Sequence, residues 1–160
     1  MDSDARPILV AYDGSDESQA AVRSAAGLFT ARRLVIASVW EPGLAMVMAT
    51  PVDPTGVGYM PPSGEAIASV DRAQRDHAVA VAEEGVRLAQ EAGAGAEAYP
   101  VADEVDISRT LAELADRLDA GAVVVGSRGL GAVKSKLLGS TSAALLHHAS
   151  KPVLVVRPPH

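Results

Sequence analysis

Four short apolar runs divide the chain and predict buried strands. None of them alternates with polar residues, as expected of strands that are covered on both faces. A fifth and weaker run at residues 96–101 alternates apolar and polar positions, which is typical of an edge strand exposed on one side. The four apolar runs lie at residues 7–12, 34–40, 122–126 and 153–156.

Between these runs, apolar residues recur three and four positions apart, a spacing that predicts helices with one buried face. The longest such stretch begins at Gly64 and stops at Gly93. His77 lies beside its apolar stripe, where a lone histidine is most simply a packing or surface residue. Shorter stretches lie at residues 20–28, 107–118 and 143–148.

Strands that alternate with helices predict a single α/β domain over residues 1–160, with a doubly wound, Rossmann-like parallel sheet and helices on both faces. The length of 160 residues and the apolar content of 48% suit one such domain. Residues 41–63 are rich in proline and methionine and show no period. They are either a variable surface loop or a cover over a ligand.

Composition excludes several classes of function. The chain has no cysteine, so it forms no disulfide, thiol nucleophile or cysteine metal site. A net charge of −6, with one Trp, three Tyr and one Phe, argues against nucleic-acid binding. Apolar runs are too short to cross a membrane, and the polar residues 1–4 do not resemble a signal peptide. We therefore expect a cytoplasmic protein.

Charge is divided unevenly along the chain. Residues 120–160 contain five Lys and Arg and no Asp or Glu, whereas residues 1–119 hold all 20 acidic residues and 9 of the 14 basic ones. Two of the three lysines, Lys134 and Lys136, flank Ser135. This polarity suggests an anionic ligand at the positive end of the molecule.

The same end carries a glycine pattern that is typical of phosphate binding. The strand at residues 122–126 ends in Gly126, and residues 139–142, Gly-Ser-Thr-Ser, begin a helix. Glycine lets the backbone approach a ligand closely, and the first amides of a helix are donors that an anion satisfies. An ordinary strand-to-helix turn also uses Gly and Ser, so the pattern alone leaves both interpretations open.

Asp13 follows the first buried strand directly. In a doubly wound sheet the carboxyl ends of the strands line the ligand crevice, so this side chain is a candidate partner for a hydroxyl or amino group. An N-cap for the helix that follows explains it equally well from spacing alone.

Three motifs resemble the nucleotide-binding branch of the universal stress protein family. Gly126 and Gly129 are separated by two residues, and nine residues later Gly139 and Ser140 complete the branch's signature. Residues 8–15, Ile-Leu-Val-Ala-Tyr-Asp-Gly-Ser, and residues 152–156, Pro-Val-Leu-Val-Val, extend the resemblance over nearly the whole chain. The resemblance implies a five-stranded sheet in the order 3-2-1-4-5.

The resemblance also implies a binding site for ATP, with Mg²⁺ on the phosphates and on a hydroxyl such as that of Ser140. Adenine would lie at Val39 and the ribose near Asp13 and Gly126, with the phosphates on the loop and helix amides. Ser38 stands where the family commonly has His, and Gly121 where it usually has Asp. The implied ligand-binding residues are Ala11, Asp13, Val39, Gly126, Ser127, Arg128, Gly129, Gly139, Ser140, Thr141 and Ser142.

Catalysis is less well supported than binding. Hydrolysis of ATP needs a group that orients water, and no acidic residue follows Asp119. We therefore predict an ATP-binding stress-response regulator with slow or no hydrolysis, acting on an unidentified protein. Alternatives are a cyclic AMP or ADP sensor, a nucleotide-free interaction module, and an ATP pyrophosphatase-type enzyme. The last shares this fold, but its loop has two adjacent glycines where residues 13–18 have one.

The last strand, Val153–Val156, predicts a homodimer. The order 3-2-1-4-5 places this strand at a sheet edge, where its backbone amides and carbonyls lack a neighbour. Pairing with its own copy about a twofold axis would satisfy both edges and close the assembly. A neighbouring loop that covers the edge is the alternative.

Overall fold

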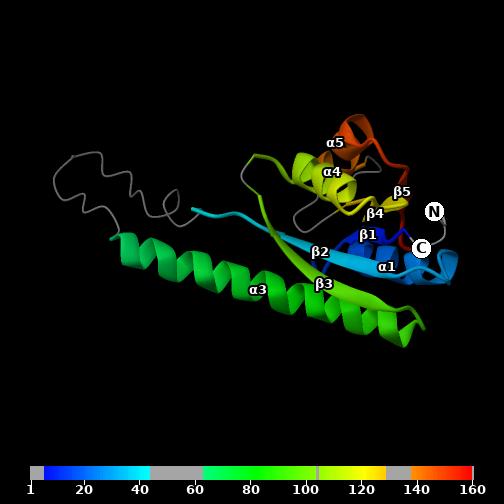
Figure 1. Cartoon of the computed structure of the whole chain (residues 1–160), viewed down its shortest axis with the longest axis horizontal. Helices are drawn as coiled ribbons and strands as arrows, with labels where there is room; N and C mark the ends of the chain where they lie inside the picture. Colours follow the sequence, from blue (N-terminus) through cyan, green and yellow to red (C-terminus); the bar gives the residue numbers. More distant parts are fainter. Residues whose placement is uncertain (1–5, 44–62, 104, 129–137, 160) are drawn as a thin grey trace.

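A computed structural model of the chain describes residues 6–43, 63–103, 105–128 and 138–159. Strands and helices alternate from β1 to β5 and form one layered α/β unit (Figure 1). The elements are β1 (Ile8–Ala11), α1 (Asp16–Leu28), β2 (Leu34–Trp40), α3 (Gly64–Glu91), β3 (Ala96–Ala102), α4 (Ile107–Arg117), β4 (Ala122–Gly126), α5 (Ser140–His148) and β5 (Val153–Val156).

The sheet has five parallel strands in the order β3-β2-β1-β4-β5, as predicted. β1 is central, and its Val10 lies opposite Ile36 of β2 and Val124 of β4. β3 and β5 form the two edges. Because all strands run the same way, the ends of β1, β2 and β4 meet at one edge of the sheet, where ligands bind in folds of this kind.

Successive residues of each buried strand point to opposite faces, and helices cover both faces as predicted. Ile8 and Val10 pack on α1 and α3, whereas Leu9 packs on α4 and α5. These three side chains are completely buried. The apolar runs therefore lack polar alternation because each one serves two cores at once.

Helix α3 is longer than the sheet that it covers. Its second half packs on the sheet through Ala78, Ala82, Gly85 and Ala89, whereas its first turns extend beyond the strands and are largely exposed. Figure 1 shows this overhang at the end where α3 begins. Among the described residues, no helix combines the length and apolar character that crossing a membrane requires.

Candidate functional site

The turn after β1 holds Asp13 in a defined orientation. Its Oδ1 accepts hydrogen bonds from the backbone N of Ser15 at 3.0 Å and from Ser15 Oγ at 2.5 Å. Ser15 itself is the N-cap of α1, and its Oγ accepts from Ser18 N at 3.2 Å. Asp13 is therefore not the cap of the helix. It orients the capping residue Ser15 from the carboxyl edge of the sheet, and this position is compatible with the ligand role proposed for Asp13.

Gly126, at the end of β4, is a glycine for a reason that the sequence did not reveal. A Cβ built at this residue would lie 2.7 Å from the backbone carbonyl carbon of Glu17 and 2.9 Å from its oxygen. We expected the missing side chain to make room for a ligand. In the structure, it makes room for the first turn of α1, because backbone atoms cannot move aside as a flexible side chain can.

The first turn of α5 is tied to the end of β4. Gly139 N donates to Ser127 O at 2.7 Å, and the buried Ser142 Oγ donates to Gly126 O at 2.7 Å. Gly139 is the N-cap of α5 and makes no side-chain cap hydrogen bond. The first amides of this helix, at Ser140 and Thr141, consequently face the carboxyl edge of the sheet with the helix dipole behind them.

The positive charge of residues 120–160 is partly compensated by the rest of the chain. Arg128 Nε lies 3.7 Å from Glu17 Oε1. Lys151 Nζ lies 2.7 Å from Asp119 Oδ1, and the hydrogen bond from Lys151 lowers the pKa of Asp119 below its ordinary value. Lys151 precedes β5 and so lies at the amino ends of the strands, whereas the candidate site lies at their carboxyl ends. Gly129, Lys134 and Lys136 lie outside the described residues.

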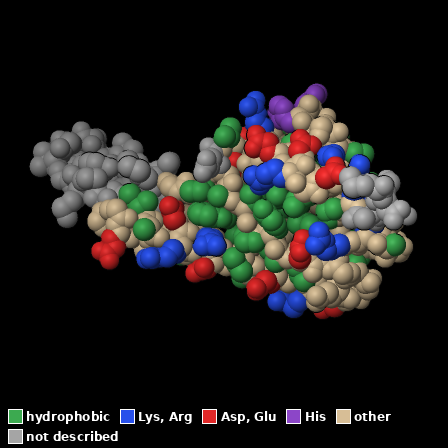
Figure 2. Space-filling view, viewed as in Figure 1, with side chains coloured by type: hydrophobic (Ala, Val, Ile, Leu, Met, Phe, Trp, Pro, Cys, Tyr) green, Lys and Arg blue, Asp and Glu red, His purple; other side chains and the backbone are tan. Residues whose placement is uncertain are grey.

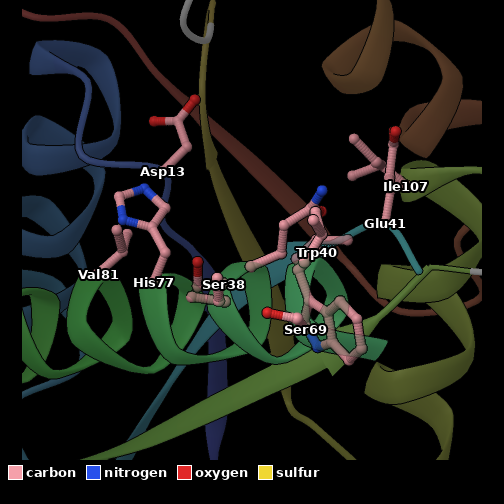
Figure 3. A pocket seen from close by; sticks show the side chains of 13 residues that line it. Asp13, Ser38, Trp40, Glu41, Ser69, His77, Val81 and Ile107 are labelled. Carbon is pink, nitrogen blue, oxygen red and sulfur yellow. The ribbon is translucent and has the colours of Figure 1, made fainter. Parts of the chain in front are cut away.

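A cavity of about 610 Å³ opens on the β2 side of β1, away from Gly126 and α5. It lies between the ends of β1 and β2 and one face of α3 (Figure 3). Its volume falls within the range of small-molecule sites, roughly 300–1,000 Å³. Its lining includes the carboxylates of Asp13 and Glu41, and no Lys or Arg within the described part of the chain. The lining residues are Asp13, Ser38, Val39, Trp40, Glu41, Ser69, Val70, Ala73, Gln74, His77, Ala78, Val81 and Ile107.

The predicted site residues thus fall into two groups at one edge of the sheet. Asp13 and Val39 line the cavity, on the β2 side of β1. Gly126, Ser127, Arg128 and the start of α5 lie on its β4 side. Ala11 ends β1 between the two groups but packs with the core under α4 and α5 instead of lining the cavity. The first group suits a neutral moiety and the second an anion.

The sequence did not predict that α3 forms one wall of the cavity. Gln74 and His77 line the cavity, although His77 was interpreted as a packing or surface residue. The only signal was the stripe of Val70, Gln74, His77 and Val81 at helical spacing, which shows that these residues share a face. It does not show that this face passes over the carboxyl ends of the strands.

A buried contact between Tyr12 and α3 holds that wall in place. Tyr12 is 2% exposed, and its hydroxyl donates to Glu84 Oε1 at 2.8 Å. A Cβ at Gly85 would lie 2.6 Å from Ile36 Cγ2 and 3.0 Å from the Tyr12 ring, so the glycine lets α3 approach the sheet. Burial, reinforced by the hydrogen bond to Glu84, raises the pKa of the Tyr12 phenol well above its ordinary value.

The face of the molecule shown in Figure 2 is mixed in character. Hydrophobic side chains gather on it between α3 and α4, while acidic and basic side chains are interspersed along α3. Val70 is 40% exposed and Val105 is 76% exposed. Among the described residues, no group of three or more His, Asp or Glu side chains is arranged to hold a metal ion.

The chain is similar to proteins of known family along most of its length. A universal stress protein of Mycolicibacterium smegmatis is 35% identical over 152 residues, covering 93% of this chain and 47% of that protein. A universal stress protein of Thermus aquaticus is 34% identical over 155 residues, covering 95% of this chain and 98% of that protein. This chain therefore spans about half the length of the mycobacterial relatives that it matches and nearly all of the Thermus one.

Comparison with solved structures points to the same family. A universal stress protein in complex with cAMP has a TM-score of 0.62 and 27% identity, over 97% of this chain and 99% of that one. Two neighbours that share the fold at lower identity are an Archaeoglobus fulgidus protein with dAMP (TM-score 0.58, 20% identity, 94% and 96% coverage) and an Arabidopsis thaliana protein with AMP (0.60, 19%, 96% and 92%). The model of the universal stress protein family, Usp, matches residues 5–157, and the chain belongs to this family.

Proposed function

We propose that this chain binds ATP and acts as a nucleotide-dependent regulator of another protein. The observation that carries the proposal is the meeting of two different surfaces at one sheet edge. A cavity without Lys or Arg in its described lining lies beside β1, and the start of α5, uncapped by its own Gly139, lies across β1 from it. A nucleotide has the same division, with a neutral base and sugar joined to an anionic phosphate chain.

The charges dictate how the nucleotide lies. The carboxylates of Asp13 and Glu41 disfavour phosphate inside the cavity, so base and ribose enter there. Asp13 accepts from a ribose hydroxyl, and the backbone at Val39 contacts adenine. The phosphates lie against the first amides of α5, with Arg128 beside them. Mg²⁺ rides on the phosphates and on the Ser140 hydroxyl.

Similar proteins support an adenine nucleotide as the ligand. The family structure at 27% identity holds cAMP, and neighbours with the same fold hold dAMP and AMP. The triphosphate is our own inference, from the Gly126, Gly129, Gly139 and Ser140 spacing and from the basic residues that follow Asp119. Because residues 120–160 contain no acid to orient water, turnover is slow or absent.

Titration calorimetry with Mg-ATP tests the proposal. We expect a dissociation constant of micromolar or tighter, about −8 kcal/mol. Titrations with ADP, AMP and cAMP distinguish the alternative ligands, and mass spectrometry of small molecules that survive purification identifies a resident one. Absence of heat and of saturation with every nucleotide at millimolar concentration would leave the nucleotide-free interaction module as the function.

We further propose that the active form is a cytoplasmic homodimer that pairs through β5. β5 is an edge strand, and three of its four residues, Val153, Leu154 and Val155, are only partly buried in the single chain. An open apolar edge favours pairing, and a twofold axis limits it to two copies. A Val155→Pro variant, which loses one edge donor, should sediment as a monomer at micromolar concentration where the natural chain sediments as a dimer.

A further inference from the structure

His77 lies at the Asp13 end of the cavity. Figure 3 shows its imidazole rising from α3 on the side of Asp13, while Glu41 and Ile107 lie at the opposite end. Gln74 lines the cavity three residues earlier, roughly 4.5 Å along the helix axis towards Ser69. Helix α3 therefore presents different side chains to successive parts of a bound ligand, and His77 faces the part that contacts Asp13.

The chemistry of this end of the cavity suits a sugar. The Asp13 carboxylate only accepts hydrogen bonds, and its Oδ1 is oriented by two bonds from Ser15. A neutral imidazole presents one donor and one acceptor nitrogen. Two neighbouring hydroxyls, each able to donate and to accept, satisfy such a pair, whereas a phosphate offers no hydrogen to the carboxylate.

We propose that His77 and Asp13 together bind the ribose hydroxyls, so that His77 makes the site selective for ribonucleotides over deoxyribonucleotides. The proposal rests on the proposed nucleotide-binding function. The fold itself does not impose this selectivity, since a neighbour with the same fold was solved with dAMP. Selectivity must therefore come from side chains, and His77 is a polar α3 side chain at the Asp13 end of the cavity.

The protein carries its own reporter for the test. Trp40 is its sole tryptophan and lines the cavity, so ligand binding can be followed by indole fluorescence. The experiment titrates ATP, 2′-deoxy-ATP and 3′-deoxy-ATP into the natural chain and into His77→Ala, His77→Gln and Ser69→Ala. His77 and Ser69 are both exposed on α3, so neither substitution disturbs the core, and Ser69→Ala is a matched control at the other end of the cavity.

We expect the natural chain and Ser69→Ala to prefer ATP to at least one deoxy analogue by about tenfold, near the upper end of what a single hydrogen bond contributes. His77→Ala should reduce the preference to within about threefold by weakening ATP and leaving the deoxy analogue unchanged. His77→Gln keeps a donor and an acceptor and should restore part of it. A general loosening of the site would instead weaken all three ligands equally.

The outcomes separate this proposal from the function on which it rests. If ATP binds and its preference over both deoxy analogues is absent or is the same in His77→Ala, the sugar-binding role of His77 is wrong and nucleotide binding stands. If no nucleotide changes Trp40 fluorescence or releases heat, both proposals are overturned.

Discussion

The two sides of β1 differ in how tightly they are built. On the β4 side, the backbones of neighbouring elements are in direct contact. Gly126 lets the Glu17 carbonyl of α1 approach β4, and Gly139 N lies 2.7 Å from Ser127 O. On the β2 side, a cavity of about 610 Å³ is lined by side chains from β2, α3 and α4. Backbone amides recognise any phosphate, whereas side chains distinguish one base or sugar from another. Changes on the β4 side should therefore cost stability or overall affinity, and changes to the side chains that line the cavity on the β2 side should cost selectivity.

The largest effect should come from Gly126→Val. Its Cβ would lie 2.7 Å from a backbone atom of Glu17, so α1 or β4 must shift, and we expect a loss of about 3 kcal/mol in the free energy of unfolding. Urea unfolding of the variant beside the natural chain measures it. A variant as stable as the natural chain would show that α1 does not pack this closely on β4.

Gly139→Val separates binding from stability on the same side. Its Cβ would lie 3.3 Å from Arg128 Cα and Ser127 O, contacts that a small shift relieves, so the unfolding free energy should fall by only about 1 kcal/mol. The branched side chain would cover the first amides of α5, and ATP affinity should fall at least about tenfold, or 1.4 kcal/mol. Calorimetry with Mg-ATP on the folded variant checks this, and unchanged affinity would remove α5 from the site.

Tyr12→Phe tests how the α3 wall is held on the other side. The loss of the hydrogen bond to Glu84 should cost about 1 kcal/mol of stability near neutral pH. Because the pKa of Tyr12 is raised in the folded state, this contribution is present below about pH 10, where an unfolded tyrosine titrates, and declines above it. Urea midpoints at pH 8 and pH 11 should therefore differ less between the two proteins at the higher pH. A difference that grows with pH would contradict the assignment.

Much of the fold followed from local pattern. The apolar runs marked β1, β2, β4 and β5 within a residue or two, because strands buried on both faces need uninterrupted apolar residues. Gly64 begins α3 as predicted, and the helix ends at Glu91, two residues before Gly93. The β4 side of the candidate site could also be predicted from the sequence, because its glycines and serines are consecutive in the chain or lie within one connection.

Only part of the β2 side of the candidate site could be predicted from the sequence. Asp13 and Val39 were predicted because they follow or end strands, and the ends of parallel strands share an edge. Trp40, Gln74, His77 and Ile107 were not predicted, because they come from three elements whose relative placement no local pattern encodes. The periodicity of α3 shows which residues share a face, but not how far the helix extends past the sheet.

The sequence by itself therefore determined the elements, their order and the glycine-bounded start of α5, since each depends on residues close together in the chain. Only the tertiary structure decided what those residues contact. It showed that Gly126 accommodates Glu17, that Arg128 and Lys151 are paired with acids from earlier in the chain, and that His77 lines a cavity. The physical reason is that close packing and charge pairing depend on distances between distant segments, which only the folded chain brings within a few ångströms of one another.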